Sequence, residues 1–123
     1  MYALNTSTRS ITALTTSSVS TVQPQVVCTY YDVLRQTKTD FSEYLRTPQL
    51  TTMAGVTSVA IVSAPNQGVT RMVEKISIYH GDASTLPIKV RYTDGTTSYT
   101  LVQWTVSTGQ TLETFNRGWH TTG

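Results

Sequence analysis

Charged residues are scarce in this sequence of 123 residues, at 13% of the chain against about 25% in an average soluble protein. The formal net charge is only +2, and the three Lys and six Arg stand singly, without a basic run or interleaved aromatic residues. Proteins that bind nucleic acid cluster their cations to neutralise phosphates. The scarcity of charge therefore predicts no direct contact with nucleic acid.

Cysteine and long apolar runs are scarce as well. A single cysteine, Cys28, forms no disulfide within these residues, and its place in the run QVVCTYY predicts a small buried side chain rather than a reactive thiol. No stretch approaches the roughly 18 apolar residues of a membrane span. The first residues, MYALNTSTRS, lack the basic and apolar regions of a signal peptide, so we expect a protein made in the cytoplasm that enters no membrane.

Catalytic patterns are missing too. The sequence contains no GxSxG, GxxxxGK[ST] or GxGxxG motif, and none of its seven carboxylates pairs with another at short spacing. Asp94 stands alone among Thr, Ser and Tyr, which predicts a turn residue. His80-Gly81-Asp82 could supply two metal ligands, whereas zinc needs three or four. We interpret His80 and His120 as surface residues and expect no enzymatic activity, cofactor or metal.

Threonine and serine take the place of charge, with 25 Thr and 12 Ser in the chain. The β-branched side chain of Thr favours strands, and hydroxyl groups tolerate burial when they are hydrogen-bonded. A chain of this length suits one domain with a modest core. We therefore predict an all-β domain whose surface is largely covered by partners.

Alternation and turn residues predict a series of short strands, most regular from residue 56. The predicted strands are VVCTYYDVL (26–34), VTSVAIVSA (56–64), VTRMVEKISIYH (69–80), LPIKVRY (86–92), SYTLVQWTV (98–106), QTLETF (110–115) and WHTT (119–122). Asp94-Gly95 between two of them predicts a hairpin, because Gly accepts positive φ and Asp tolerates it. This spacing indicates a sandwich or a barrel rather than a βαβ fold. Of these we predict an antiparallel β-sandwich with a jelly-roll-like arrangement.

Two of these strands make specific predictions about side-chain faces. In 69–80 alternation places Met72, Glu74, Ile76 and Ile78 on one face and Val73, Lys75, Ser77 and Tyr79 on the other. We expect Ile76 and Ile78 to face the core and Glu74 to lie near the rim, where its charge can reach water. In 86–92 it directs Leu86, Ile88, Val90 and Tyr92 to one side, and Lys89 and Arg91 to the other. Pro87 has no N–H to donate, which predicts that this strand starts late or lies at an edge.

Residues 1–25 differ from the rest, since they are Thr/Ser-rich, weakly alternating and almost uncharged. Alone, they bury too little apolar surface to offset their ordering entropy. We predict an extended N-terminal arm, distinct from a sandwich domain of residues 26–123. The arm would be held against its own domain or against a neighbouring chain, and the rest of the chain is expected to stay folded without it.

One short helix is predicted near residues 40–46. Asp40 can cap its start, with Glu43 three residues later as in a capping box. Phe41, Tyr44 and Leu45 would share one face, and Pro48 would end the helix.

The pieces between Val56 and Thr121 follow one another in a distinctive order. A strand with a Pro-x-x-Gly turn is followed by a strand that leads into an exposed turn, a long hairpin, a second turn and a terminal Gly-Trp: VAIVSAPNQGVTR, MVEKISIYHGD, LPIKVRYTDGTTSYTLVQWTV, STGQTLE and RGWHTT. In this order they resemble a β-sandwich module of structural proteins in tailed double-stranded DNA bacteriophages. Residues 1–55 lie outside the resemblance.

The resemblance implies a non-enzymatic virion protein, made in the host cytoplasm, and in the first place a capsid decoration or cement protein that binds the major capsid protein. A head–tail connector or tail-associated protein is the alternative within this class. Either would form a symmetric homo-oligomer, as a trimer or a ring. The expected partner-binding residues are the apolar residues of the arm and three outward cations: Tyr2, Leu4, Ile11, Leu14, Val19, Val22, Arg71, Lys89 and Arg91.

A glycan-binding module is the alternative from a different class. Its aromatic platform would use Trp104, Trp119 and Tyr92, with Tyr99 beside them. Aromatic residues in strands more often belong to the core or to cross-strand pairs, so this hypothesis ranks second.

Overall fold

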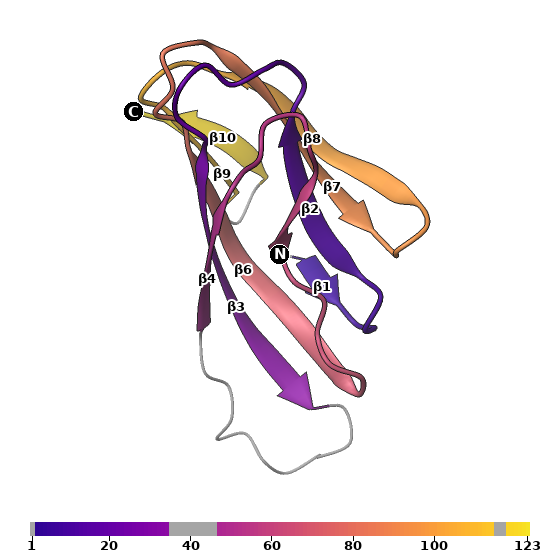
Figure 1. Ribbon diagram of the computed structural model, residues 1–123. Coiled ribbons are helices and arrows are strands. Elements are labelled where there is room, and N and C mark those ends of the chain that lie inside the picture. Colours follow the sequence, from indigo (N-terminus) through magenta and orange to yellow (C-terminus); the bar gives the residue numbers. More distant parts are fainter. Residues whose placement is uncertain (1, 35–46, 115–117) are drawn as a thin grey trace.

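The computed structural model describes residues 2–34, 47–114 and 118–123, and within these ranges the chain forms ten β-strands and no helix (Figure 1). The strands are β1 (Tyr2–Leu4), β2 (Ser10–Thr15), β3 (Gln25–Leu34), β4 (Thr47–Thr52), β5 (Val59–Val62), β6 (Val69–Tyr79), β7 (Leu86–Thr93), β8 (Ser98–Val106), β9 (Thr111–Thr114) and β10 (Trp119–Thr122). They form two antiparallel sheets that pack as the layers of a β-sandwich. The all-β prediction is confirmed.

Sheet A has the strand order β10-β9-β6-β3-β4, and sheet B has the order β5-β2-β7-β8. β1 joins sheet A by pairing with β6 at Arg71–Val73, while β9 pairs with β6 at Ile76–Tyr79. Consecutive strands pair within a sheet as β3–β4, β7–β8 and β9–β10. This order does not confirm the jelly-roll-like arrangement. The helix predicted near 40–46 lies outside the described residues.

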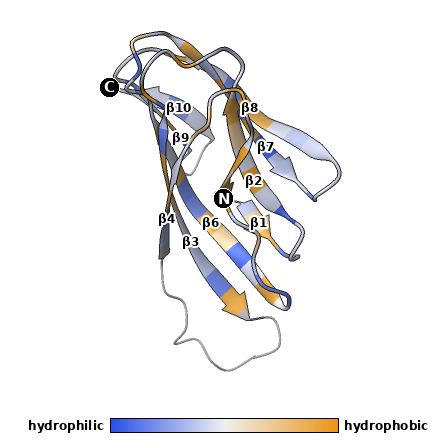
Figure 2. Ribbon diagram, in the orientation of Figure 1, coloured by the Kyte–Doolittle hydropathy of each residue, from blue (hydrophilic) through white to orange (hydrophobic). Residues whose placement is uncertain are grey.

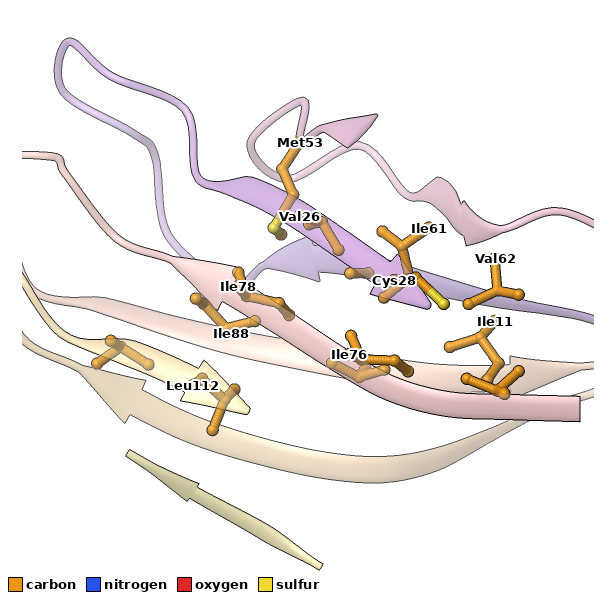
Figure 3. Close-up of a cluster of buried hydrophobic side chains, with 14 of the residues drawn as sticks. Ile11, Val26, Cys28, Met53, Ile61, Val62, Ile76, Ile78, Ile88 and Leu112 are labelled. Carbon is orange, nitrogen blue, oxygen red and sulfur yellow. The ribbon is translucent and has the colours of Figure 1, made fainter. Parts of the chain in front are cut away.

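The hydrophobic core lies between the two sheets. Figure 3 shows Ile76 and Ile78 of β6, from sheet A, among Ile11 and Ile88 of sheet B, and all four side chains are 0% exposed. Along the strands hydrophobic residues alternate with hydrophilic ones (Figure 2), as a sheet with one buried face requires. The predicted core positions Ile76 and Ile78 are confirmed.

The N-terminal residues are part of the sandwich rather than a separate arm. β2 lies between β5 and β7 inside sheet B, and its side chains alternate between buried and half-buried. Leu4 of β1 and Ile11 of β2 are fully buried. The prediction of an arm over 1–25 is corrected for residues 2–15, which are held against their own domain. Six residues of weak alternation were enough for a strand because neighbours on both sides complete its hydrogen bonds.

Two aromatic side chains hold β1 in place. The Tyr92 hydroxyl of sheet B donates a hydrogen bond to the Ala3 carbonyl at 3.1 Å. The Trp119 indole N–H of β10 donates to the Tyr2 hydroxyl, also at 3.1 Å. β1 therefore links the two sheets beside the last strand of the chain.

A β-bulge corrects the predicted faces of β6. The pairing register between β3 and β6 shifts at Thr29/Tyr30, and Arg71 and Val73 are buried together with Ile76. An extra residue in a ladder reverses the side chains that face inward. Strict alternation therefore assigned Arg71 and Val73 to the wrong face.

The predicted hairpin around Asp94-Gly95 is confirmed, with β7 and β8 paired antiparallel on either side of it. Gly95 has φ 101°, a conformation that glycine adopts without strain. Pro87 does not mark an edge, because β7 begins at Leu86 and lies between β2 and β8. Pro87 lies opposite Thr16, just beyond the end of β2, where its carbonyl accepts the Thr16 N–H. The N–H that Pro87 lacks would therefore have bonded only at the end of the ladder, so its absence costs the sheet little.

The placement of β2 predicts a stability difference between two adjacent residues. Ile11→Ala should lower the free energy of unfolding by about 2–5 kcal/mol, because it leaves a cavity in the core. Thr12→Ala, on the outer face of the same strand, should change it by less than about 1 kcal/mol. Urea unfolding followed by circular dichroism measures both values. Equal, small effects would show that β2 is a detachable arm.

Candidate interaction surfaces

His80 is a buried residue, which corrects its interpretation as a surface histidine. Its side chain is 0% exposed. One ring nitrogen, Nδ1, lies 3.4 Å from the N–H of Asp82, and the other, Nε2, lies 2.6 Å from the carbonyl oxygen of Ser84. A carbonyl accepts and an N–H donates, so these partners fit the neutral ring with its proton on Nε2. His80 closes a tight turn rather than facing a ligand.

Asp82 is buried beside it and holds a distant segment of the chain. Its carboxylate accepts the main-chain N–H groups of Ser20, Thr21 and Val22 at 3.0, 2.7 and 2.9 Å, and the Ser84 hydroxyl at 2.5 Å. These donors lower the pKa of Asp82 well below its ordinary value, with the Ser84 hydroxyl the largest cause and the N–H groups next. No local sequence signal predicts this contact, because the donors lie about 60 residues away.

The turn from His80 to Ser84 crosses from β6 to β7, and it contacts two other segments that cross between the sheets. The crossing from β2 to β3 is held by the Asp82 carboxylate. The crossing from β8 to β9 is held by a hydrogen bond from the Thr108 hydroxyl to the Asp82 carbonyl at 2.7 Å, and by main-chain bonds of His80 to Gly109 and Gln110. We call this the crossover end of the sandwich. The polar groups of His80 and Asp82 at this end form hydrogen bonds within the protein.

Arg71 is also used internally, which corrects its placement among the outward partner-binding cations. Its guanidinium donates to both carboxylate oxygens of Asp32, at 2.8 and 3.0 Å, and to the carbonyl and hydroxyl of Ser63, at 2.8 and 2.9 Å. It lies 4.0 Å from the ring centroid of Tyr30. The hydrogen bond to Asp32 is the largest cause of its raised pKa. The ion pair joins β3 and β6 of sheet A to the segment after β5 of sheet B.

The remaining single candidates have structural roles. Asp94 caps its own hairpin turn, where Oδ1 accepts the N–H groups of Thr96 and Thr97 at 3.0 and 2.7 Å. The Thr97 bond is the largest cause of the lowered pKa of Asp94. Cys28 is a free thiol with 0% exposure, as its apolar run predicts. Among the described residues no group of three or more His, Cys, Asp or Glu side chains could hold a metal ion.

The four aromatic residues named for a glycan platform do not gather on one surface. Trp119 and Tyr92 are half-buried, and their polar atoms bond inward to β1. Trp104 and Tyr99 are exposed on β8, but they pair with Ile88 and Tyr92 at opposite ends of β7. Stacking on a sugar needs adjacent open rings, so this arrangement gives little support to the glycan-binding alternative.

Sheet A and the segment that leads into β3 carry four exposed apolar side chains, Val22, Val27, Leu50 and Tyr79, which are 45%, 44%, 74% and 49% exposed and which we call the apolar patch. Val27 and Leu50 are cross-strand partners on β3 and β4. Tyr79 and Val22 both approach Gly81. A shallow hollow of about 290 Å³ opens between β3 and β4, lined in part by Val27 and Leu50. Because Cys28 was predicted to be buried, alternation along the strand could have identified its neighbour Val27 as outward-facing. Leu50 could not have been found in this way, because its strand, β4, was not predicted.

Three charged or titratable side chains of sheet A lie together. The Glu113 carboxylate of β9 lies 3.4 Å from the Lys75 ammonium of β6 and 3.1 Å from Nε2 of His120 on β10. Burial acts to raise the pKa of Glu113, but Lys75 and His120 outweigh it and hold that pKa below its ordinary value. The charge of Glu113 on sheet A is therefore compensated by the basic groups beside it, next to the exposed apolar side chains of the same sheet.

The outer face of sheet B is different, because its two cations have no partner among the residues that the structure describes. Lys89 and Arg91 are half-buried on the outward side of β7, as predicted. Neither has an ion pair or a side-chain hydrogen bond to any described residue, and the Nε atom of Arg91 is buried without a hydrogen-bond partner.

The apolar residues expected to contact a partner divide into two groups. Leu4 and Ile11 are 0% exposed and belong to the core, so they are unavailable to a partner in this fold. Tyr2, Leu14 and Val19 are half-buried, and Val22 is exposed within the apolar patch. Tyr2 and Val19 pack against the core, whereas Val22, Leu14, Lys89 and Arg91 retain surface that a partner could reach.

No helix among the described residues is long and apolar enough to cross a membrane. Comparison with protein-family models, with curated proteins and with solved structures gives no match.

The Asp82 contacts predict acid-sensitive stability. A carboxyl whose pKa is lower in the folded state binds more protons when unfolded, so its stabilisation is complete above the ordinary value of 3.8 and is lost as the pH falls below it. Asp82→Asn should lower the unfolding midpoint by several degrees at about pH 7 and reduce the further loss of stability as the pH falls from about 4 to about 2. Asp94→Asn is the matched control. It should lower the unfolding midpoint less than Asp82→Asn, because the hydrogen-bond donors to Asp94 lie in its own turn. Asp82→Asn with unchanged midpoints would contradict the anchoring role.

Burial of Cys28 predicts an unreactive thiol. Desolvation raises its pKa from 9.0 to about 12, against a smaller opposite effect of the Arg71 charge, which corresponds to roughly a thousandfold less thiolate at neutral pH. Iodoacetamide should therefore leave the native protein unmodified while alkylating it rapidly in urea, as mass spectrometry would measure. Equal rates in both states would show that the thiol is accessible.

Proposed function

We propose that this chain is a non-enzymatic virion protein of a tailed double-stranded DNA bacteriophage, and specifically a capsid decoration or cement protein that binds the coat-protein shell. The order of strands and turns between Val56 and Thr121 supports the class. The observation that carries the proposal is the apolar patch on sheet A, where Leu50 is 74% exposed beside Val27. Exposed apolar side chains that adjoin one another mark contact surfaces.

The rest of the exterior fits a protein that works by contact. Most outward positions of β8 are Ser, Thr or Gln, and that strand contains no charged residue. Hydroxyl and amide groups form hydrogen bonds across an interface without the desolvation cost of a charge. β4 and β8 each end a sheet, so their outer main-chain groups are open to pairing with a strand of a neighbour.

The mechanism follows from these surfaces. A rigid sandwich with one contact face in each layer would bind two adjoining coat subunits at once. Separating those subunits, as pressure from packaged DNA tends to do, would require breaking the contacts of both faces. The clamp would be repeated over the shell, in a trimer or ring set by the symmetry of the lattice. The contacts with the coat protein are assigned to the faces of the sheets rather than to an N-terminal arm, because residues 2–15 are paired within the sandwich.

Copy number in purified virions tests this proposal, by quantitative mass spectrometry against the coat protein. A number that matches the coat lattice is the expected result. A number that matches a single ring would place the protein at the neck or tail, which is the alternative within the class. Absence from particles would overturn the virion proposal.

A substitution in the apolar patch should separate binding from folding. Leu50→Glu should reduce the amount of protein bound to particles by about tenfold or more, since a buried unpaired charge disrupts an apolar contact. Val56→Glu is the matched control: Val56 is 60% exposed but lies outside the patch. Both variants should keep the wild-type unfolding midpoint. Equal loss of binding, or none, would show that the patch is not the interface.

A further inference from the structure

The four strands of sheet B contain no acidic residue, and Lys89 and Arg91 of β7 are their only charged residues. Elsewhere in the described part of the chain, Arg71 is paired with Asp32, and Lys75 and His120 are paired with Glu113. The outer face of sheet B therefore keeps an uncompensated positive charge. Such a face attracts a partner of opposite charge.

The surroundings of Arg91 position its side chain for a ligand. Its cross-strand neighbours are Thr12 of β2 and Thr100 of β8. The register of β7 and β8 shifts beside it, which leaves Leu101 as the extra residue of a bulge. Bulges re-aim nearby side chains. The Arg91 Nε atom is buried but makes no hydrogen bond, and a buried donor without a partner is rare and costly. The terminal N–H groups of the same guanidinium can donate in parallel to both oxygens of one carboxylate.

Lys89 and Arg91 stand two residues apart on the same side of one strand, which separates their Cα atoms by about 7 Å. Leu14 and Gln103 flank Lys89 on the neighbouring strands. An extended peptide repeats the same spacing, because its alternate side chains also stand about 7 Å apart on one side. The geometry thus matches two carboxylates at alternate residues of an extended segment.

We propose that the outer face of sheet B binds an acidic extended segment of a neighbouring virion protein, with alternate Asp or Glu side chains received by Lys89 and Arg91. The partner's location in the virion rests on the proposed function, whereas its chemistry rests on this face alone. A protein partner fits better than nucleic acid, since a phosphate backbone is held by a larger number of cations and the remaining positions here are hydroxyl, amide and apolar.

Fluorescence anisotropy with a labelled synthetic peptide in which Glu alternates with Thr tests the proposal on the full chain at low ionic strength. The wild-type protein should bind this peptide in a salt-sensitive manner and should not bind the same peptide with Gln in place of Glu. Lys89→Gln and Arg91→Gln should each weaken binding by about tenfold. Arg91→Lys should restore only part of the affinity, since it keeps the charge but loses the bidentate geometry.

Arg9→Gln is the matched control, because Arg9 has the same charge but lies outside sheet B and donates to Asn5. It should leave the affinity unchanged, and all variants should keep the wild-type circular dichroism spectrum. A folded wild-type chain that does not bind the Glu peptide, or variants that bind it equally well, would overturn the inference. So would tighter binding to a labelled DNA duplex that the same substitutions abolish.

The virion proposal is judged separately. A chain present at the copy number of the coat lattice that fails the peptide test would overturn the acidic-partner inference alone. A chain absent from particles that passes it would overturn the virion location and leave the chemistry of the face standing.

Discussion

The carboxylate of Asp82 is the constraint on which the crossover end of the sandwich depends. Each time the chain changes sheets, its main-chain N–H groups leave the ladder and need another acceptor. Asp82 supplies one for Ser20, Thr21 and Val22 in a single group, and its own carbonyl accepts the Thr108 hydroxyl. The turn after β6 thereby sets the positions of the entries to β3 and β9.

The other charged groups of the interior act in the same way. Arg71 and Asp32 join sheet A to Ser63 after β5, so a polar contact links the two layers away from the crossover end. With the apolar core between them, the sheets are held in one relative position. Arg71 and Asp82 form their contacts inside the protein. The apolar patch therefore remains on sheet A, and Lys89 and Arg91 remain on sheet B without an ion-pair partner among the described residues. This division supports a protein that contacts different partners with its two faces.

Much of the fold could be predicted from short-range patterns. Alternation and turn residues located β3 and every strand from β5 to β10, and the apolar run around Cys28 predicted its burial. The failures share one cause. Arg71 and Val73 face inward because of a bulge opposite Thr29/Tyr30, and His80 is buried because the crossing segments pack over it. Both features depend on residues that are distant in the sequence, so the local alternation of side chains does not reveal them.

The sequence by itself determined that the chain is all-β, that Asp94-Gly95 reverses it, and that its exterior carries little charge, because these follow from side-chain chemistry and from a period of two. Only the tertiary structure decided that residues 2–15 complete both sheets, that Asp82 and Arg71 are internal, and that Lys89 and Arg91 have no ion-pair partner within the described ranges. Strand order, register and burial arise from pairings between distant segments, and the pairing that is chosen is the one that closes the core and satisfies the buried polar groups together.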